Sequence, residues 1–89
     1  MDLQDLKHRA EVCMKQGNLY DLQGDPAKAE QQYLEALKIQ EALLKNCGDD
    51  SCRKMAGEIC EILADLNMQQ GNMHGADVYY VKAFSYQNP

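Results

Sequence analysis

Four cysteines and two histidines are the side chains of this 89-residue chain that could form a zinc site of the Cys and His type, and the cysteines could undergo redox chemistry. Cys47 and Cys52 flank a short turn, and a loop of this length permits a disulfide between them. Zinc sites favour paired C-x-x-C spacing, which the sequence lacks. A Cys47–Cys52 disulfide and a zinc or redox role therefore stay as alternatives, while Cys13 and Cys60 are predicted to be small apolar side chains of a core.

Catalytic motifs are absent from the sequence. It contains no G-x-S-x-G elbow, no Walker loop and no H-E-x-x-H helix. Its carboxylates fall on predicted helix surfaces, where desolvation would shift their pKa values only weakly. We therefore predict that the chain is not an enzyme and uses no metal or cofactor.

The charge balance restricts the partners of the chain. Nine Lys and Arg face 14 Asp and Glu, which gives a net charge of −5. Such a surface repels phosphate backbones and anionic lipids, so we expect no nucleic acid and no membrane, but a protein or peptide with basic residues. Apolar stretches are far shorter than the roughly 20 residues of a membrane span, and the acidic start does not resemble a signal peptide. The prediction is a cytoplasmic, intracellular protein.

Glycine and Asp or Asn divide the chain into four predicted helices, at about 3–23, 26–46, 51–70 and 73–87. Gly24 and Gly71 suit the left-handed residue after a helix, and Asp25 and Asn72 suit the N-cap that follows. No period-two pattern or hairpin signal indicates a strand. The predicted fold class is all-α, with antiparallel helix pairs.

A shift of 47 residues aligns the second half of the chain with the first. Identical pairs fall where helices turn or pack closely, among them Gly24 with Gly71, Ala29 with Ala76, Tyr33 with Tyr80 and Ala36 with Ala83. Periods of this size are typical of stacked helical repeats. We predict a single domain over 1–89, with repeat one at about 3–47 and repeat two at about 51–88, either alone or as a fragment of a longer array.

The first repeat resembles a tetratricopeptide repeat through Gly17, Tyr20, Gly24, Ala29, Tyr33, Ala36 and Leu37. The second matches less fully, because Asn67 replaces the aromatic residue between the helices. The 47-residue spacing exceeds the usual 34 or so, and the segment 33–41 is similar to the longer repeats of kinesin light chains. The resemblance covers residues 10–89 and implies two antiparallel helix-turn-helix repeats stacked as a short right-handed superhelix. A four-helix bundle around one core is the structural alternative.

The resemblance places one stripe of each repeat's first helix on a concave surface: Glu11, Met14, Asn18 and Asp21, then Glu58, Glu61, Asp65 and Met68. Five carboxylates and two methionines predict an acidic groove with apolar spots, suited to a basic or amphipathic peptide or helix. The predicted function is a non-enzymatic protein–protein interaction module, a scaffold or adaptor. The alternative is that these residues form ordinary solvated helix faces.

The last predicted helix carries apolar residues away from its packing stripe. Tyr20, Tyr33 and Tyr80 are predicted to lie in the core, whereas Tyr79 and Tyr86 fall outside the stripe. Val78, Val81 and Tyr86 form a predicted apolar end-face. Because nothing after them covers this face, it requires a continuation of the array, a partner chain or self-association. A structural assembly subunit that docks through this end-face is the alternative function.

Overall fold

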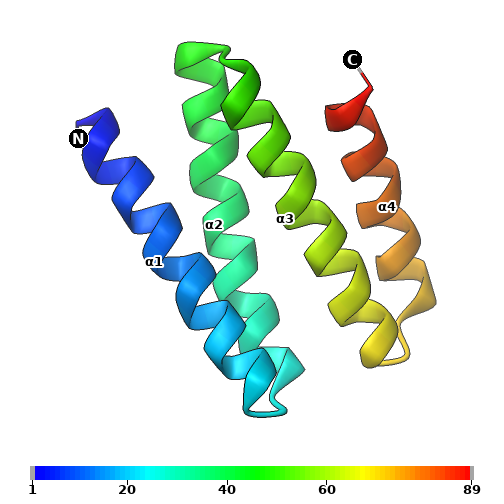
Figure 1. Cartoon of the computed structure of the whole chain (residues 1–89). Helices are drawn as coiled ribbons and strands as arrows, with labels where there is room; N and C mark the ends of the chain where they lie inside the picture. Colours follow the sequence, from blue (N-terminus) through cyan, green and yellow to red (C-terminus); the bar gives the residue numbers. More distant parts are fainter. Residues whose placement is uncertain (1, 89) are drawn as a thin grey trace.

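The computed structural model describes residues 2–88, apart from the side chain of Cys47, and they form four helices (Figure 1). These are α1 Leu3–Leu22, α2 Pro26–Cys47, α3 Asp50–Gln69 and α4 Met73–Gln87. Each observed helix end lies within one residue of its predicted position. The described residues contain no strand, and the prediction of an all-α fold is confirmed.

Local capping explains why the helix ends could be predicted. The side chains of Asp25 and Asn72 accept hydrogen bonds from the backbone N–H groups of Lys28 and Gly75, which stabilises the first turns of α2 and α4. Gly24 and Gly71 have φ angles of 79° and 78°, a conformation that favours glycine. The two hairpin turns are therefore alike, and α3 begins and ends 47 residues after α1.

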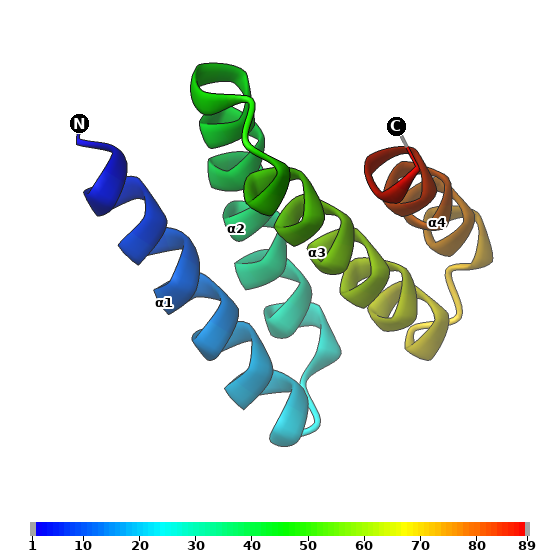
Figure 2. The same ribbon diagram turned by 45° about the horizontal axis from the view of Figure 1, so that its top comes forward.

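The four helices lie side by side in chain order, and each packs against the next (Figures 1 and 2). Within residues 2–88, close backbone approaches join α1 to α2, α2 to α3 and α3 to α4, and no other pair of helices. The molecule measures 35 × 27 × 14 Å, so it is a flat stack. This arrangement excludes the four-helix bundle around one core and has the packing of tetratricopeptide-like hairpins.

The hydrophobic core runs through the junction between the two hairpins. Its largest fully buried side chains are Leu43, Ile59, Cys60, Leu63 and Leu66. One continuous cluster joins Tyr33 and Leu37 of α2 to Ile59 and Leu63 of α3 and to Ala83 of α4. The hairpins therefore share apolar contacts and do not have separate cores.

The tyrosines follow the prediction only in part. Tyr33 is buried, and Tyr20 is half-buried against the core. The prediction for Tyr80 is wrong, because its side chain is 40% exposed. Tyr79, expected outside the packing stripe, is half-buried against the core instead.

A neighbouring residue explains the difference between Tyr33 and Tyr80. A Cβ atom at Gly17 would lie 2.7 Å from the Tyr33 ring, so the ring lies where only glycine leaves room. The corresponding residue of the second hairpin is Ala64, whose Cβ occupies that space. In addition, α3 covers Tyr33, whereas the structure describes no helix after α4.

Candidate functional site

On one face of the stack, two hollows are lined by residues of α1 and α3, and α2 lies between these two helices. The first has a volume of about 230 Å³. Asn18 and Asp21 of α1 face Ile62, Asp65 and Gln69 of α3 across it, and it is also lined by Tyr33 and Leu66. Carboxylates from two helices thus border a hollow that an aromatic ring and an aliphatic side chain help to line.

The second hollow lies nearer the amino end of α1 and has a volume of about 200 Å³. Its lining residues are Lys7, Glu11, Met14, Gln40, Ser51, Cys52 and Met55. Lys7 partly balances Glu11 here, so this hollow has mixed charge, and the acidic character of the face is concentrated around Asp21 and Asp65.

The predicted groove residues on α1 all line one of these hollows: Glu11, Met14, Asn18 and Asp21. The predicted stripe on α3 is arranged differently. Only Asp65 borders the face towards α1, and Glu61 and Asp65 line a third hollow, between α3 and α4, with Tyr80 and Phe84. Glu58 is exposed and borders none of the three hollows.

Hydrogen bonds from α4 hold much of the α3 stripe. The Tyr80 hydroxyl donates to Asp65 Oδ1 at 2.7 Å and lies 3.5 Å from Met68 Sδ, and Gln87 Nε2 donates to Glu61 Oε1. The bond from Tyr80 to Asp65 raises the pKa of the tyrosine, because it favours the protonated phenol. These α3 residues are therefore already in contact with protein side chains.

Asp21 and Asp65 keep uncompensated charge. Neither forms an ion pair with any residue in the range 2–88. Burial raises the pKa of Tyr33, and the nearby charge of Asp21 raises it further. The negative potential of this hollow therefore reaches the side chains that line it, which favours a cationic partner.

Sequence reasoning missed Lys7, Gln40, Met55, Ile62 and Gln69, which line the α1–α3 hollows. Ile62 and Met55 lie on the side of α3 that turns towards α2 and α1. Their spacing of seven residues, which places two apolar side chains on one side of a helix, was the available signal.

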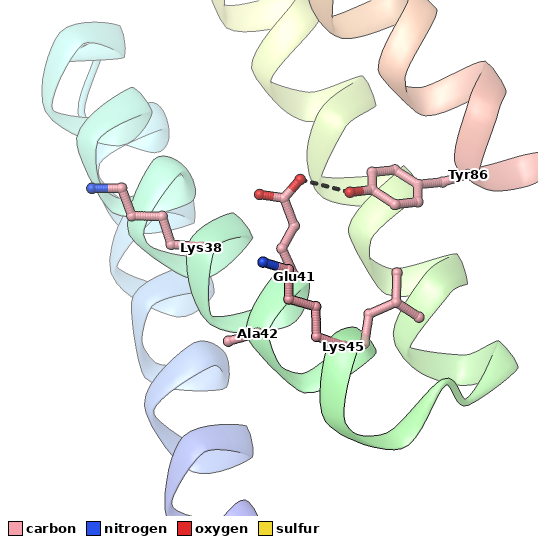
Figure 3. A pocket seen from close by; sticks show the side chains of 6 residues that line it. Lys38, Glu41, Ala42, Lys45 and Tyr86 are labelled. Atoms are coloured by element: carbon pink, nitrogen blue, oxygen red, sulfur yellow. Dashed lines mark hydrogen bonds between the residues drawn. The ribbon is translucent and has the colours of Figure 1, made fainter.

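A larger hollow, of about 540 Å³, lies between α2 and α4 (Figure 3). The Tyr86 hydroxyl donates to Glu41 Oε2 at 2.6 Å, and Lys82 Nζ lies 3.4 Å from the same carboxylate oxygen. Burial and this hydrogen bond raise the pKa of Tyr86. Tyr86 packs against the core and connects the two hairpins, so it does not lie in an end-face with Val78 and Val81, which are 45% and 66% exposed.

Cys13 and Cys60 are poor candidates for thiolate chemistry. Burial raises the pKa of Cys60 to about 11 and raises that of Cys13, so both thiols are protonated at neutral pH. In the described part of the chain, no three His, Cys, Asp or Glu side chains are grouped as metal ligands. The predicted Cys47–Cys52 disulfide falls outside the described residues, because it depends on the Cys47 side chain.

Two stacked helical hairpins with hollows along one face define a protein of the α-helical repeat class. Within that class, residues 10–43 match the family model of the tetratricopeptide repeat, which covers most of α1 and α2. Repeats of this family generally mediate protein–protein interactions and are generally not enzymes. No curated protein and no solved structure matches the chain. None of the described helices combines the length and the apolar character that crossing a membrane requires.

Proposed function

We propose that the chain is a protein–protein interaction module that binds a basic or amphipathic peptide or helix along the hollowed face between α1 and α3. The observation that carries this proposal is the hollow between Asp21 and Asp65. Its carboxylates have no cationic partner among the described residues, and Tyr33, Ile62 and Leu66 give it apolar surface. Basic side chains of a partner would pair with the carboxylates, and apolar ones would cover the rest.

The long repeat spacing belongs to the same proposal. A 47-residue period gives α2 22 residues and α3 20 residues. Helices of this length extend the face so that the hollow near Glu11 and the hollow near Asp21 lie in line. We propose that this is the arrangement of kinesin light chain-like repeats, with repeat one at 3–47 and repeat two at 51–88.

A charge reversal on α1 tests the binding face. Asp21→Lys is the sharpest change, because its carboxylate forms no hydrogen bond or ion pair with the described residues, whereas Glu61 and Asp65 are bound by α4. The probe is an amphipathic helical peptide of Lys, Leu and Ala, compared with its counterpart in which Glu replaces Lys. We expect the basic peptide to bind and Asp21→Lys to weaken it about tenfold, which corresponds to roughly 1.4 kcal/mol.

Glu35→Lys is the matched control, because it makes the same charge change at an exposed α2 residue that lines neither hollow. Titration calorimetry at low protein concentration measures both variants. Equal binding of the basic and acidic peptides, or an equal effect of the two reversals, would contradict a groove between α1 and α3.

An assembly subunit that docks through the end of α4 is the second candidate. The exposure of Val78 and Val81 favours it, although Tyr86 does not contribute to that surface. Under this function the peptide would not bind, and changes at Asp21 would have no effect on assembly.

A further inference from the structure

The packing of α3 on α2, at the junction between the two hairpins, shows how this chain covers an apolar helix face. On the α2 side, Tyr33 and Leu37 are only 6% and 4% exposed, and Leu34 packs against the same cluster. On the α3 side, Ile59, Leu63 and Leu66 are at most 1% exposed. The chain therefore already contains one complete joint between a second helix and the first helix of the next hairpin.

The carboxyl-terminal helix repeats the α2 half of this joint without a cover. Forty-seven residues after Tyr33, Leu34 and Leu37 come Tyr80, Val81 and Phe84. Their exposed fractions are 40%, 66% and 66%. We call these residues the tail face.

The first helix repeats the α3 half, also without a cover. Val12 and Leu19 correspond to Ile59 and Leu66, and they are 37% and 56% exposed. Gln16 takes the place of Leu63 and Arg9 that of the buried Ala56, so this surface is less apolar than its internal counterpart. We call Val12, Lys15, Gln16 and Leu19 the head face. One molecule thus exposes both halves of the joint, at opposite ends of the stack.

Charged residues beside the head face and the tail face favour a second copy of this chain over another apolar partner. Inside the chain, Ile62 lies opposite Asn18, and Met55 lies opposite Met14. Forty-seven residues before Ile62 and Met55 lie Lys15 and His8 of α1. Forty-seven residues after Asn18 and Met14 lie Asp65 and Glu61 of α3. If the head face of one copy covers the tail face of another as α3 covers α2, the Lys15 ammonium comes to lie near the Asp65 carboxylate, and His8 near Glu61.

We propose that this chain associates head to tail, with the head face of one copy packed on the tail face of the next in the geometry of the α2–α3 joint. Because the two surfaces differ, the contact is heterologous and does not close at a dimer, so it continues the superhelix. The polar Gln16 and the net charge of −5 on each copy make the association reversible. Binding of a peptide between α1 and α3 is not required for it.

Sedimentation equilibrium of the whole chain over a wide range of concentration tests this proposal. We expect the average mass to rise from 10.1 kDa and to pass the dimer mass without a plateau. Phe84→Glu should disable the tail face, and Leu19→Glu the head face, each weakening association roughly tenfold or more. Both side chains are largely exposed, so circular dichroism should show unchanged helix content.

Mixing the two variants gives the sharpest outcome. The Phe84→Glu copy keeps its head face and the Leu19→Glu copy keeps its tail face, so an equimolar mixture should form a dimer and stop there. If the contact were symmetric between two tail faces, Leu19→Glu would associate like the unchanged chain, which would overturn the proposal. A chain that stays monomeric at all concentrations would overturn it as well and would assign the tail face to another occupant.

Two control variants separate this joint from other contacts. Val78 corresponds to Gln31, which α3 leaves exposed, so Val78→Glu should not change association. Lys15→Glu should weaken association, whereas Lys38→Glu makes the same charge change on α2 and should have little effect. An effect of Val78→Glu equal to that of Phe84→Glu would indicate a general apolar end contact and would contradict the proposed geometry.

Discussion

Single residues explain why two hairpins with similar sequences differ. Gly17 lets the Tyr33 ring approach the backbone of α1, and Ala64 prevents the same approach by Tyr80. Instead, Tyr80 lies over Asp65 and donates a hydrogen bond to it. The methyl group that distinguishes Ala64 from Gly17 thus helps to explain why Tyr80 is exposed and Tyr33 is buried.

Gly17→Ala should destabilise the protein. The new methyl group would lie 2.7 Å from the buried Tyr33 ring, and overpacking of this kind costs about 1–3 kcal/mol. The better helix propensity of alanine returns up to about 1 kcal/mol, so we expect a net loss of about 1–2 kcal/mol in urea unfolding. In a Tyr33→Leu background the cost should shrink. An unchanged cost there would mean that the ring is not the obstacle.

Cys60 gives the protein a predictable dependence on alkaline pH. Burial raises the pKa of its thiol from 9.0 to about 11, so the folded state keeps a proton that the unfolded state loses. Its contribution to stability is complete below pH 9 and is lost as the pH rises from 9 to about 11. The unchanged chain should therefore lose on the order of 2 kcal/mol more than Cys60→Ala over this range. The measurement is urea unfolding at a series of pH values. An equal fall in the free energy of unfolding of the two proteins over this pH range would contradict the prediction.

At the scale of the element, local signals determined what could be predicted. Helix ends depend on neighbouring residues such as Asp25, Gly24 and Asn72, and these are visible in the sequence. The α1 stripe also lies in the hollows, because its face follows from the positions of Ala10 and Gly17. The α3 stripe could not be placed in the same way, because Tyr80 and Gln87 of another helix hold Asp65 and Glu61.

A polar cluster at the α3–α4 turn fixes one hairpin against the other. The buried Asn67 donates to Leu63 O at 2.7 Å and to Glu30 Oε2 at 3.3 Å, and it accepts from Asn72 Nδ2 at 3.0 Å. Gln70 Nε2 donates to the other oxygen of Glu30 at 2.8 Å. The amide of Asn67 thus replaces an aromatic ring by hydrogen bonds that reach from α3 to α2 and to the turn.

Asn67→Ala should cost about 1–3 kcal/mol, because it leaves a cavity and removes partners from Glu30 and Asn72. Gln70→Ala is the matched control at an exposed residue and should cost less than about 1 kcal/mol. Restoring the aromatic residue with Asn67→Tyr should not recover stability, since Gly75 lies directly against the amide of Asn67. Thermal unfolding measures all three, and a stabilising effect of Asn67→Tyr would contradict this account.

On the scale of the whole molecule, the shared core predicts that the hairpins fold together. Tyr33 and Leu37 of the first hairpin lie in one buried cluster with Ile59 and Leu63 of α3 in the second. A fragment that ends at Gly48 would expose this face and keep little beyond the contacts between α1 and α2. Such a short helix pair cannot offset the conformational entropy of its chain.

We therefore expect the whole chain to unfold in a single transition, with the same midpoint by circular dichroism and by tyrosine fluorescence. The isolated fragments 1–48 and 49–89 should each show weak helix signals, and an equimolar mixture should regain helix as the α2–α3 joint forms. Leu37→Ala should abolish this recovery and should cost the whole chain about 2–5 kcal/mol, because it empties a buried position of that joint. A first fragment that is fully helical and melts cooperatively alone would show instead that each hairpin is an independent unit.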